Sequence, residues 1–356
     1  MPIKERYYAI FTKYKLIESR IMIIKSDFSL LKHNTFGIDA KCSRYIEYSS
    51  VEELQNIVKM EFDITHALHI GGGSNLLFLN DFKGTILHCD IKTIEIAEED
   101  KSSAYVRVGA GVVWDKFVKF CVDHHYYGAE NLSYIPGEVG AAPVQNVGAY
   151  GVEAKDIIHK VEVVDTKTAE LKVFDAADCC FGYRYSKFKA EWKGAYFVHH
   201  VVFKLSKTPS FKLEYGRIKD CLEGKQPTLQ VVRDTIITIR KDKLPEPSVI
   251  GSAGSFFKNP IVQRTVFDKL VKEHPNMHFY NVDDNMVKIP AGWLIEQCGW
   301  KGRNHKNVGV YEKQSLIIVN RGGATGAEVE ELANMIVNDV NTHFGIKICP
   351  EVCYIK

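Results

Sequence analysis

The sequence has no long hydrophobic run, and this absence shapes what we expect of its relation to membranes. None of its apolar stretches approaches the roughly 20 residues that a transmembrane helix requires. Near the N-terminus the only apolar stretch ends after five residues at Thr12 and Lys13, and no small-residue cleavage site follows it. We therefore expect neither a membrane-spanning segment nor a signal peptide, and we expect a cytoplasmic protein.

A strong charge of either sign is also missing. Lysine and arginine total 46 and aspartate and glutamate total 44, which leaves a formal net charge of +2. Proteins that bind nucleic acids or anionic membrane surfaces usually carry a basic excess. We expect neither kind of partner.

Paired cysteine motifs are absent as well. The nine cysteines include no C-x-x-C pair, and apart from the adjacent Cys179 and Cys180 they are scattered singly. We therefore expect reduced, mostly buried thiols and no metal site.

Hydrophobic periodicity predicts helices and strands in one mixed chain. Residues 1–21 resemble an extension, and Pro245 and Pro247 indicate a linker before the last domain. Ser50 and Glu53 form a capping box for a helix at 51–60, and Thr325 and Glu328 form another for the last helix. Other helices are predicted at 114–122, 228–241, 266–272 and 291–298, and strands at 67–70, 105–108, 161–165, 170–174, 195–205, 316–320 and the C-terminus.

The most unusual stretch, Tyr134 to Glu153, contains very few large side chains. Its four glycines alternate with three alanines, and two prolines fix the backbone between them. Backbone N–H and C=O groups can therefore come close to a flat or anionic ligand. Gln145 and Asn146 add side-chain amides that can read the edge of a heterocycle. A surface loop is the alternative, but the spacing and the lack of charge favour the bed of a bound cofactor.

A second glycine run, GGGSN at 71–75, follows a predicted strand. It is not the Rossmann fingerprint, because Leu76 occupies the third glycine position. Its consecutive backbone N–H groups can form an anion nest for a pyrophosphate, and a plain tight turn fits the run equally well. Two glycine-rich loops far apart in the sequence suit a large dinucleotide such as FAD.

Three further residues stand in unusual contexts. Ser255 lies between Gly254 and Phe256, where a turn residue is the ordinary interpretation. Arg184 lies between two tyrosines, where a stacked surface cation is the ordinary interpretation. Glu351 interrupts an apolar terminal strand and needs a partner, because an unpaired buried carboxylate would cost several kcal/mol.

In chain order, these stretches resemble the family of UDP-N-acetylenolpyruvoylglucosamine reductases, flavoenzymes that make UDP-N-acetylmuramate for bacterial peptidoglycan. The matching motifs are GGGSNLLFL, IPGEVGAAPVQNVGAYGVE, YRYSKFK, GSAGSFFKNP, AGWLIEQCGWKG and PEV. They extend from about Asn34 to the C-terminus. FKLEYGR, which contains Tyr215, matches the inserted loop of the longer (type I) form.

The resemblance implies an α+β fold with three parts. A two-subdomain FAD-binding unit of the vanillyl-alcohol-oxidase (p-cresol methylhydroxylase) type precedes a C-terminal α+β substrate-binding domain. The implied division is an extension at 1–21, FAD-binding subdomains at 22–93 and 94–241 with a tyrosine loop near 207–227, a substrate-binding domain at 242–350, and a terminal strand at 351–356 that carries the catalytic glutamate.

The resemblance also implies roles for individual residues. Ser255 is the implied proton donor, and Arg184 and Glu351 stabilise the intermediate. The implied FAD contacts are Gly71, Gly72, Gly73, Ser74, Asn75, Leu76, Pro136, Gly137, Gly140, Ala141, Gln145, Asn146, Gly148, Ala149, Tyr150 and Gly151. The implied sugar-nucleotide contacts are Tyr183, Tyr215, Lys243, Asn259, Tyr280, Lys301 and Gln314. Because the GGGSN loop contains no histidine, we expect non-covalent FAD. At the position of Cys353 the family more usually has arginine.

The implied reaction is the NADPH-dependent reduction of UDP-N-acetylglucosamine-enolpyruvate by a monomer. The reduction pushes negative charge onto the carbon beside the carboxylate, which a fixed guanidinium such as Arg184 can stabilise. A positioned acid then protonates that carbon. Glu351 could be a protonated donor or could orient a water.

Two alternatives to the reductase function remain. One is an oxidase of the same flavin superfamily, which would not need Ser255, and the other is a non-catalytic UDP-sugar-binding protein.

Overall fold

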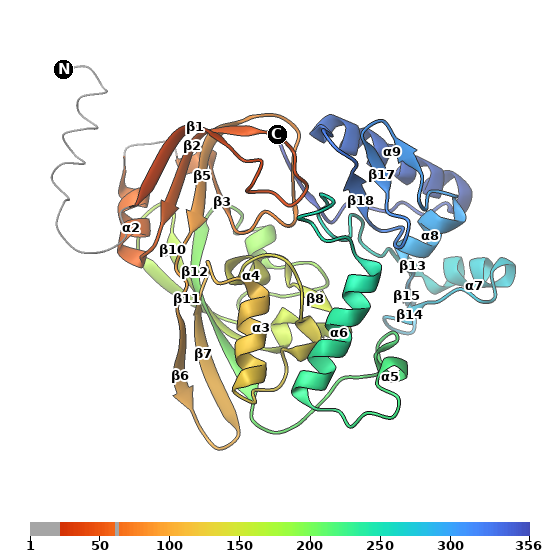
Figure 1. Ribbon diagram of the computed structural model, residues 1–356, viewed down its shortest axis with the longest axis horizontal. Helices are drawn as coiled ribbons and strands as arrows, with labels where there is room; N and C mark the ends of the chain where they lie inside the picture. Colours follow the sequence, from red (N-terminus) through yellow and green to blue (C-terminus); the bar gives the residue numbers. More distant parts are fainter. Residues whose placement is uncertain (1–21, 61–63) are drawn as a thin grey trace.

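Two β-sheets organise the N-terminal half of the molecule, and a smaller α+β unit forms the C-terminal half (Figure 1). The computed structural model describes residues 22–60 and 64–356. The predicted extension at 1–21 lies outside the described residues. Among the helices in the described ranges, none has the length and apolarity needed to cross a membrane.

The first sheet is mixed and has the strand order β1–β2–β5–β3. β1 (Ile23–Ser29) is antiparallel to β2 (Lys41–Tyr48), whereas β5 (Phe82–Cys89) is parallel to both β2 and β3 (Ala67–Ile70). Its central strands bury apolar side chains on both faces because part of the sheet lies between two cores. Ile46 and Tyr48 of β2 join the core under the second sheet, and Tyr45 joins the core of the C-terminal half.

Helix α2 (Val51–Lys59) lies between β2 and β3 in the sequence, and Ser50 is its N-cap as predicted. The Ser50 hydroxyl accepts a hydrogen bond from the backbone N–H of Glu53 at 3.1 Å. The Glu53 carboxylate accepts from the backbone N–H of Ser49 at 2.7 Å, so the predicted capping box closes one residue upstream.

The second sheet is antiparallel, with the order β11–β10–β12–β7–β6. Its strands are β6 (Ile94–Glu99), β7 (Ser103–Gly109), β10 (Ile158–Asp165), β11 (Leu171–Asp175) and β12 (Tyr196–Ser206). The predicted strands of this region are confirmed; only the exposed edge strand β6 was not predicted.

Two helices accompany this sheet. Helix α3 (Trp114–Asp123) packs on the sheet, where Phe117 stacks on Phe203 at 4.3 Å between ring centroids. Helix α6 (Leu229–Lys243) lies beside α3, and Arg233 forms an ion pair with Asp115 at 2.7 Å (Figure 1).

The C-terminal half contains two small antiparallel sheets and three helices. The sheets are β13 (Ile261–Gln263), β15 (Met286–Lys288) and β14 (Tyr280–Asn281), and β16 (Asn304–His305), β17 (Val308–Val310) and β18 (Ile318–Asn320). The helices are α7 (Arg264–Glu273), α8 (Ala291–Gln297) and α9 (Gly326–Phe344). The predicted capping box of α9 is confirmed, because Thr325 and Glu328 exchange hydrogen bonds at 3.2 and 2.9 Å.

The C-terminus returns to the first half of the chain. β19 (Cys353–Ile355) is parallel to β4 (Leu76–Phe78), which directly follows the GGGSN loop. The prediction that the terminal strand contains Glu351 is wrong, because residues 349–351 instead hydrogen-bond to residues 256–258 before the chain turns onto β4.

The remaining short helices and strands of the described residues are α4 (Ala142–Gln145), α5 (Ile218–Cys221), β8 (Gly148–Ala149) and β9 (Val152–Glu153), together with five single-turn 3₁₀ helices. The nine cysteines are all free thiols, but only four are buried, so the prediction of mostly buried thiols is wrong. The two large sheets take their strands from 23–89 and 94–206, while the domain boundaries themselves stay predictions.

Candidate active site

The two glycine-rich loops lie against each other. The Ser74 hydroxyl donates to the backbone carbonyl of Pro136 at 3.1 Å, and the Asn75 amide donates to Gln145 Oε1 at 2.7 Å. A side chain at Gly72 would contact Gly137 Cα at 3.4 Å. The structure therefore brings together the two stretches that the sequence predicted for one cofactor.

Glycine is required at specific positions of this cradle. Gly73 has a φ of +63°, and a Cβ there would lie 2.0 Å from the carbonyl oxygen of His33. Gly137 has a φ of +117°, and its Cβ would lie 2.8 Å from Ser74 Oγ. The two loops lie close together and have few side chains, so their backbone N–H groups are accessible to a dinucleotide pyrophosphate. The residues present therefore fit FAD.

The end of the second loop is a tight hairpin. β8 pairs with β9, and both turn residues, Tyr150 and Gly151, have positive φ values of 49° and 78°, as a type I′ turn requires. At Gly148 a side chain would lie 2.9 Å from Glu153 Cγ and 3.1 Å from Arg184 Nη1. Gly148 therefore lets Arg184 approach the backbone.

Asn146 has a structural role that the sequence did not show. Its side-chain amide donates to Glu153 Oε2 at 2.8 Å and to the carbonyl of Gly182 at 2.9 Å, and it accepts from the N–H of Lys155 at 2.9 Å. Both amide protons are thus used within the protein. The interpretation that this side chain donates to a heterocycle is not supported, and the whole residue is buried.

Arg184 and Glu351 form the ion pair at the centre of the site. Arg184 Nε lies 2.7 Å from Glu351 Oε1, and the two side chains are only 18% and 10% exposed. Arg184 Nη2 also donates to the carbonyl of Gly148 at 2.9 Å. The prediction that Glu351 needs a partner is confirmed, and Arg184 is that partner.

Ser255 lies beside this pair in the backbone network. Its neighbour Phe256 is fully buried and accepts a hydrogen bond from the Glu351 N–H at 2.7 Å. The Phe256 N–H donates to the carbonyl of Leu316 at 2.7 Å. Ser255 itself is exposed. The two backbone hydrogen bonds of the buried Phe256 therefore fix the chain next to an accessible serine.

Two basic residues near the pair were not singled out in the sequence, although both lie within the matching motifs. They are Lys189 and Lys258. Lys189 Nζ lies 3.5 Å from Gln145 Oε1, and burial, together with the nearby charge of Lys258, lowers the pKa of Lys189.

The two cysteines that flank Glu351 have different surroundings. Cys353 Sγ lies 4.0 Å from the Asn75 amide, whereas Cys349 is exposed. Of the two cysteines that flank the glutamate, only Cys353 contacts the cofactor loop.

A tyrosine cluster extends the site towards the C-terminal half. Tyr215 stacks on Tyr280 at 5.4 Å with an interplanar angle of 5°. Lys288 Nζ lies 4.8 Å from the ring centre of Tyr183 and 5.4 Å from that of Tyr280. Burial lowers the pKa of Lys288. The sequence did not reveal Lys288; its only signal is a lysine between the apolar Val287 and Ile289.

Three of the other four predicted substrate contacts, Lys301, Gln314 and Asn259, have local partners. Lys301 pairs with Glu296 at 2.9 Å, and Gln314 Oε1 accepts from the N–H of Leu316 at 3.4 Å. Asn259 Oδ1 accepts from the N–H of Ala291 at 2.9 Å and so caps α8. Lys243 is the last residue of α6.

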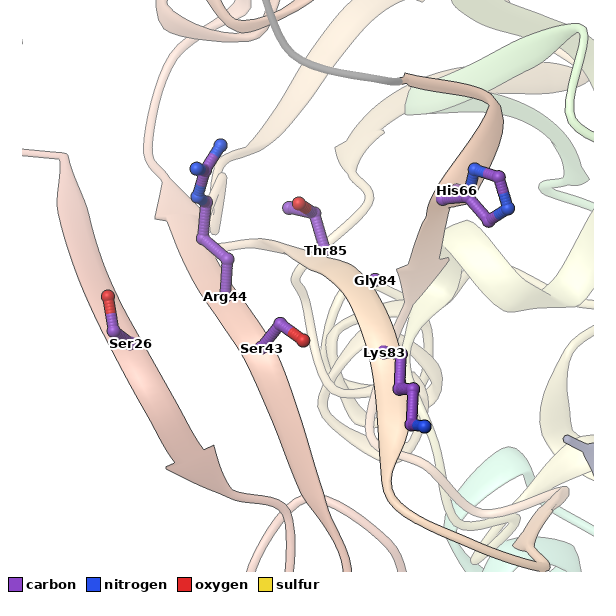
Figure 2. Close-up of a pocket in the computed structure, with 7 residues that line it drawn as sticks. All are labelled: Ser26, Ser43, Arg44, His66, Lys83, Gly84 and Thr85. Atoms are coloured by element: carbon purple, nitrogen blue, oxygen red, sulfur yellow. The ribbon is translucent and has the colours of Figure 1, made fainter. Parts of the chain in front are cut away.

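Two open pockets have none of the predicted site residues in their lining. The first, of about 410 Å³, is formed mainly by β1, β2 and β5 and is lined by Ser26, Ser43, Arg44, His66, Lys83, Gly84 and Thr85 (Figure 2). The second, of about 420 Å³, is lined by Phe36, Gly37, Asn320, Arg321, Gly322 and residues 247–251.

One buried group in the second sheet has the residue types of a metal site. Glu162, His199 and His200 place one ligand atom each within 4.8 Å of one another. However, Arg107 donates to both oxygens of Glu162, at 3.0 and 2.7 Å, and the two imidazoles hydrogen-bond to each other at 2.7 Å. These bonds occupy both oxygens of Glu162 and the Nδ1 atoms of both histidines.

Two family models match the chain. Residues 43–174 match an FAD binding domain, and residues 246–355 match the C-terminal domain of UDP-N-acetylenolpyruvoylglucosamine reductase.

Curated relatives match along almost the whole chain. A UDP-N-acetylenolpyruvoylglucosamine reductase of Bacteroides fragilis is 52% identical over 93% of this chain and 100% of the relative. One of Porphyromonas gingivalis is 48% identical over 94% of this chain and 100% of the relative. The crystal structure of the reductase from Thermus caldophilus is similar with a TM-score of 0.67 at 22% identity, over 94% of this chain and 100% of that one.

Proposed function

Because the chain belongs to the UDP-N-acetylenolpyruvoylglucosamine reductase family, we propose that it reduces UDP-N-acetylglucosamine-enolpyruvate to UDP-N-acetylmuramate for peptidoglycan synthesis. Its fold is the FAD-binding unit of that family followed by the family's C-terminal domain. FAD, when bound, supplies the two-electron chemistry, and NADPH is the proposed reductant. We further propose a monomer that works in the cytoplasm.

The observation that carries this proposal is the Arg184–Glu351 ion pair, which lies between the cofactor loops and Ser255. Arg184 contacts the carbonyl of Gly148 in the second glycine-rich loop, and Glu351 contacts the backbone of Phe256 next to Ser255. Reduction of the enol ether places negative charge on a carbon and its carboxylate. A guanidinium held in a mostly buried position can stabilise that charge, because little water screens it.

Ser255 is the proposed proton donor. Serine is a weak acid, but against a carbanion the position of the proton matters more than the acidity of its donor. The buried Phe256 fixes the backbone on one side of Ser255, while the hydroxyl remains accessible. Glu351, fixed by Arg184, is placed either to donate a proton or to orient a water.

Lys288 and the tyrosine cluster are the proposed site for the diphosphate of the sugar nucleotide. Lys288 contributes a half-buried positive charge, and the stacked Tyr215 and Tyr280 hold the inserted loop against β14. The predicted contacts Lys243, Asn259, Lys301 and Gln314 remain proposals.

A reductive titration tests the function. NADPH added without oxygen should bleach the visible absorbance of the flavoprotein, and UDP-N-acetylglucosamine-enolpyruvate should restore it with formation of UDP-N-acetylmuramate. Recovery with air but not with the enolpyruvyl sugar would identify an oxidase. A protein without flavin that binds UDP-sugars would be a binding protein.

A further inference from the structure

A histidine lies between two carboxylates beneath the GGGSN loop. His88 of β5 places Nδ1 2.9 Å from Glu47 Oε2 on β2 and Nε2 3.2 Å from Glu138 Oε1 in the second glycine-rich loop. The side chains of His88 and Glu138 are each 12% exposed. None of the predicted site residues or proposed roles includes this group.

The geometry indicates that His88 is charged. A neutral imidazole has one N–H and can donate to only one carboxylate, whereas the imidazolium donates to both. Burial alone would lower the pKa of His88, but hydrogen bonds to Glu138 and Glu47 outweigh it and raise the pKa. The other groups that face His88 are the rings of His33 and Tyr45, at 6.2 and 6.3 Å, and the buried His69.

Glu138 connects this charge to the cofactor cradle. Its Oε2 would lie 3.2 Å from a Cβ at Gly71, the first residue of the loop. The same oxygen is buried and has no hydrogen-bond partner among the described residues. The preceding Gly137 faces Gly72 across the cradle. A carboxylate therefore lies directly beneath the backbone on which a pyrophosphate is proposed to lie, and the two anions would repel each other.

We propose that protonated His88 is a positioning residue for the flavin dinucleotide: it holds Glu138 against Gly71 and offsets its charge beneath the pyrophosphate. This role rests on the proposed function in one respect, namely that the bound group is FAD. Loss of the His88 proton leaves Glu138 uncompensated, so FAD affinity falls as the pH rises through the raised pKa of His88.

The test measures the dissociation constant of FAD on the apoprotein by flavin fluorescence quenching, from about pH 6 to about pH 9. It compares the wild type with His88→Gln, Glu138→Gln and the double variant. We expect His88→Gln to weaken FAD binding by roughly tenfold or more at the lowest pH, because one charge near a partly buried anion has an effect of that order. The double variant should regain most of the affinity, since the carboxylate that needed compensation is gone. Glu138→Gln should bind FAD at least as tightly as the wild type and should lose the pH dependence.

A purely structural role for His88 predicts a different pattern. The double variant would then be as weak as His88→Gln, both would unfold at a lower temperature as apoproteins, and the proposal would be wrong. Wild-type affinity in His88→Gln at low pH, or an unchanged pH dependence in Glu138→Gln, would also overturn it while leaving the proposed function intact. A wild-type protein that binds no FAD would overturn both.

Discussion

At the scale of single residues, Arg184 is strained and firmly held. Its φ of 55° lies in the left-handed region, which costs a non-glycine residue about 1–3 kcal/mol. Contacts with Glu351, with the carbonyl of Gly148 and with the ring of Tyr183 hold its guanidinium in place. These contacts fix the guanidinium on which the proposed reaction depends.

Ser255→Ala tests the proposed proton donor. The hydroxyl is needed only after NADPH has reduced the flavin, so reduction by NADPH should proceed at a near-native rate. Reoxidation by the enolpyruvyl sugar should slow by ~10²- to 10⁴-fold, the usual scale for a positioned acid. Stopped-flow absorbance measures both half-reactions separately.

Ser255→Cys is the matched control, because a thiol can still donate a proton, and it should recover part of the lost rate. Equal slowing of both half-reactions in Ser255→Ala would instead show that the residue only shapes its turn.

Tyr215→Phe and Lys288→Met test the proposed diphosphate site. Both residues are proposed to lie away from the reacting carbon, so the KM for the sugar nucleotide should rise more than kcat falls. Steady-state kinetics separate the two constants. Lys306→Met, at an exposed lysine that pairs with Glu331, is the control and should change neither. A fall in kcat alone would place Tyr215 or Lys288 in the chemical step.

Single residues also show how far the sequence can predict the site. Glu351 was predicted to need a partner because a lone buried carboxylate is costly, and the ion pair with Arg184 supplies it. Lys288 was not predicted, because Tyr183 comes from a distant segment and Tyr280 becomes its neighbour only through the pairing of β14 with β15. The amide of Asn146 was misinterpreted because its partners Glu153 and Gly182 are likewise set by the fold.

At the scale of elements, local signals were sufficient where a helix or strand is stabilised by its own sequence. The capping box of α9 and the alternating strands β10, β11 and β12 are examples. The prediction of the terminal strand was wrong because its pairing is set by distant segments. Residues 349–351 hydrogen-bond to residues 256–258, and only residues 353–355 pair with β4. Sequence periodicity does not distinguish these two partners.

Thr325→Ala tests the contribution of the α9 cap. It removes the acceptor for the Glu328 N–H, so the free energy of unfolding should fall by about 1 kcal/mol, the usual value for an N-cap. Urea unfolding of the apoprotein measures the change. Thr325→Ser keeps the hydroxyl and should stay close to the wild type; an equal loss in both variants would assign the effect to the lost methyl group.

At the scale of the whole molecule, the first sheet is the structural centre. It contributes Ile46 and Tyr48 to one core, and Tyr45 and Ile86 to the other, so it connects the second sheet to the C-terminal half. The order of the motifs predicted that these parts exist, but it did not predict that one sheet would be buried between them.

Deletion of residues 1–21 tests whether the extension contributes to the site. The family motifs begin after it, and Met22 offers a natural start. Flavin content and turnover should therefore match those of the full chain. Loss of FAD from the shortened protein would show that the extension supports the cofactor-binding unit.

The return of the C-terminus to β4 affects how the protein is made. A chain folds as it leaves the ribosome, N-terminal parts first, so both large sheets can form during translation. Glu351 and β19 are synthesised after both sheets, and until then Arg184 lacks its partner Glu351 and β4 lacks its parallel neighbour β19. A product that stops before Glu351 therefore lacks the carboxylate of the central ion pair, and one that stops before Cys353 lacks β19.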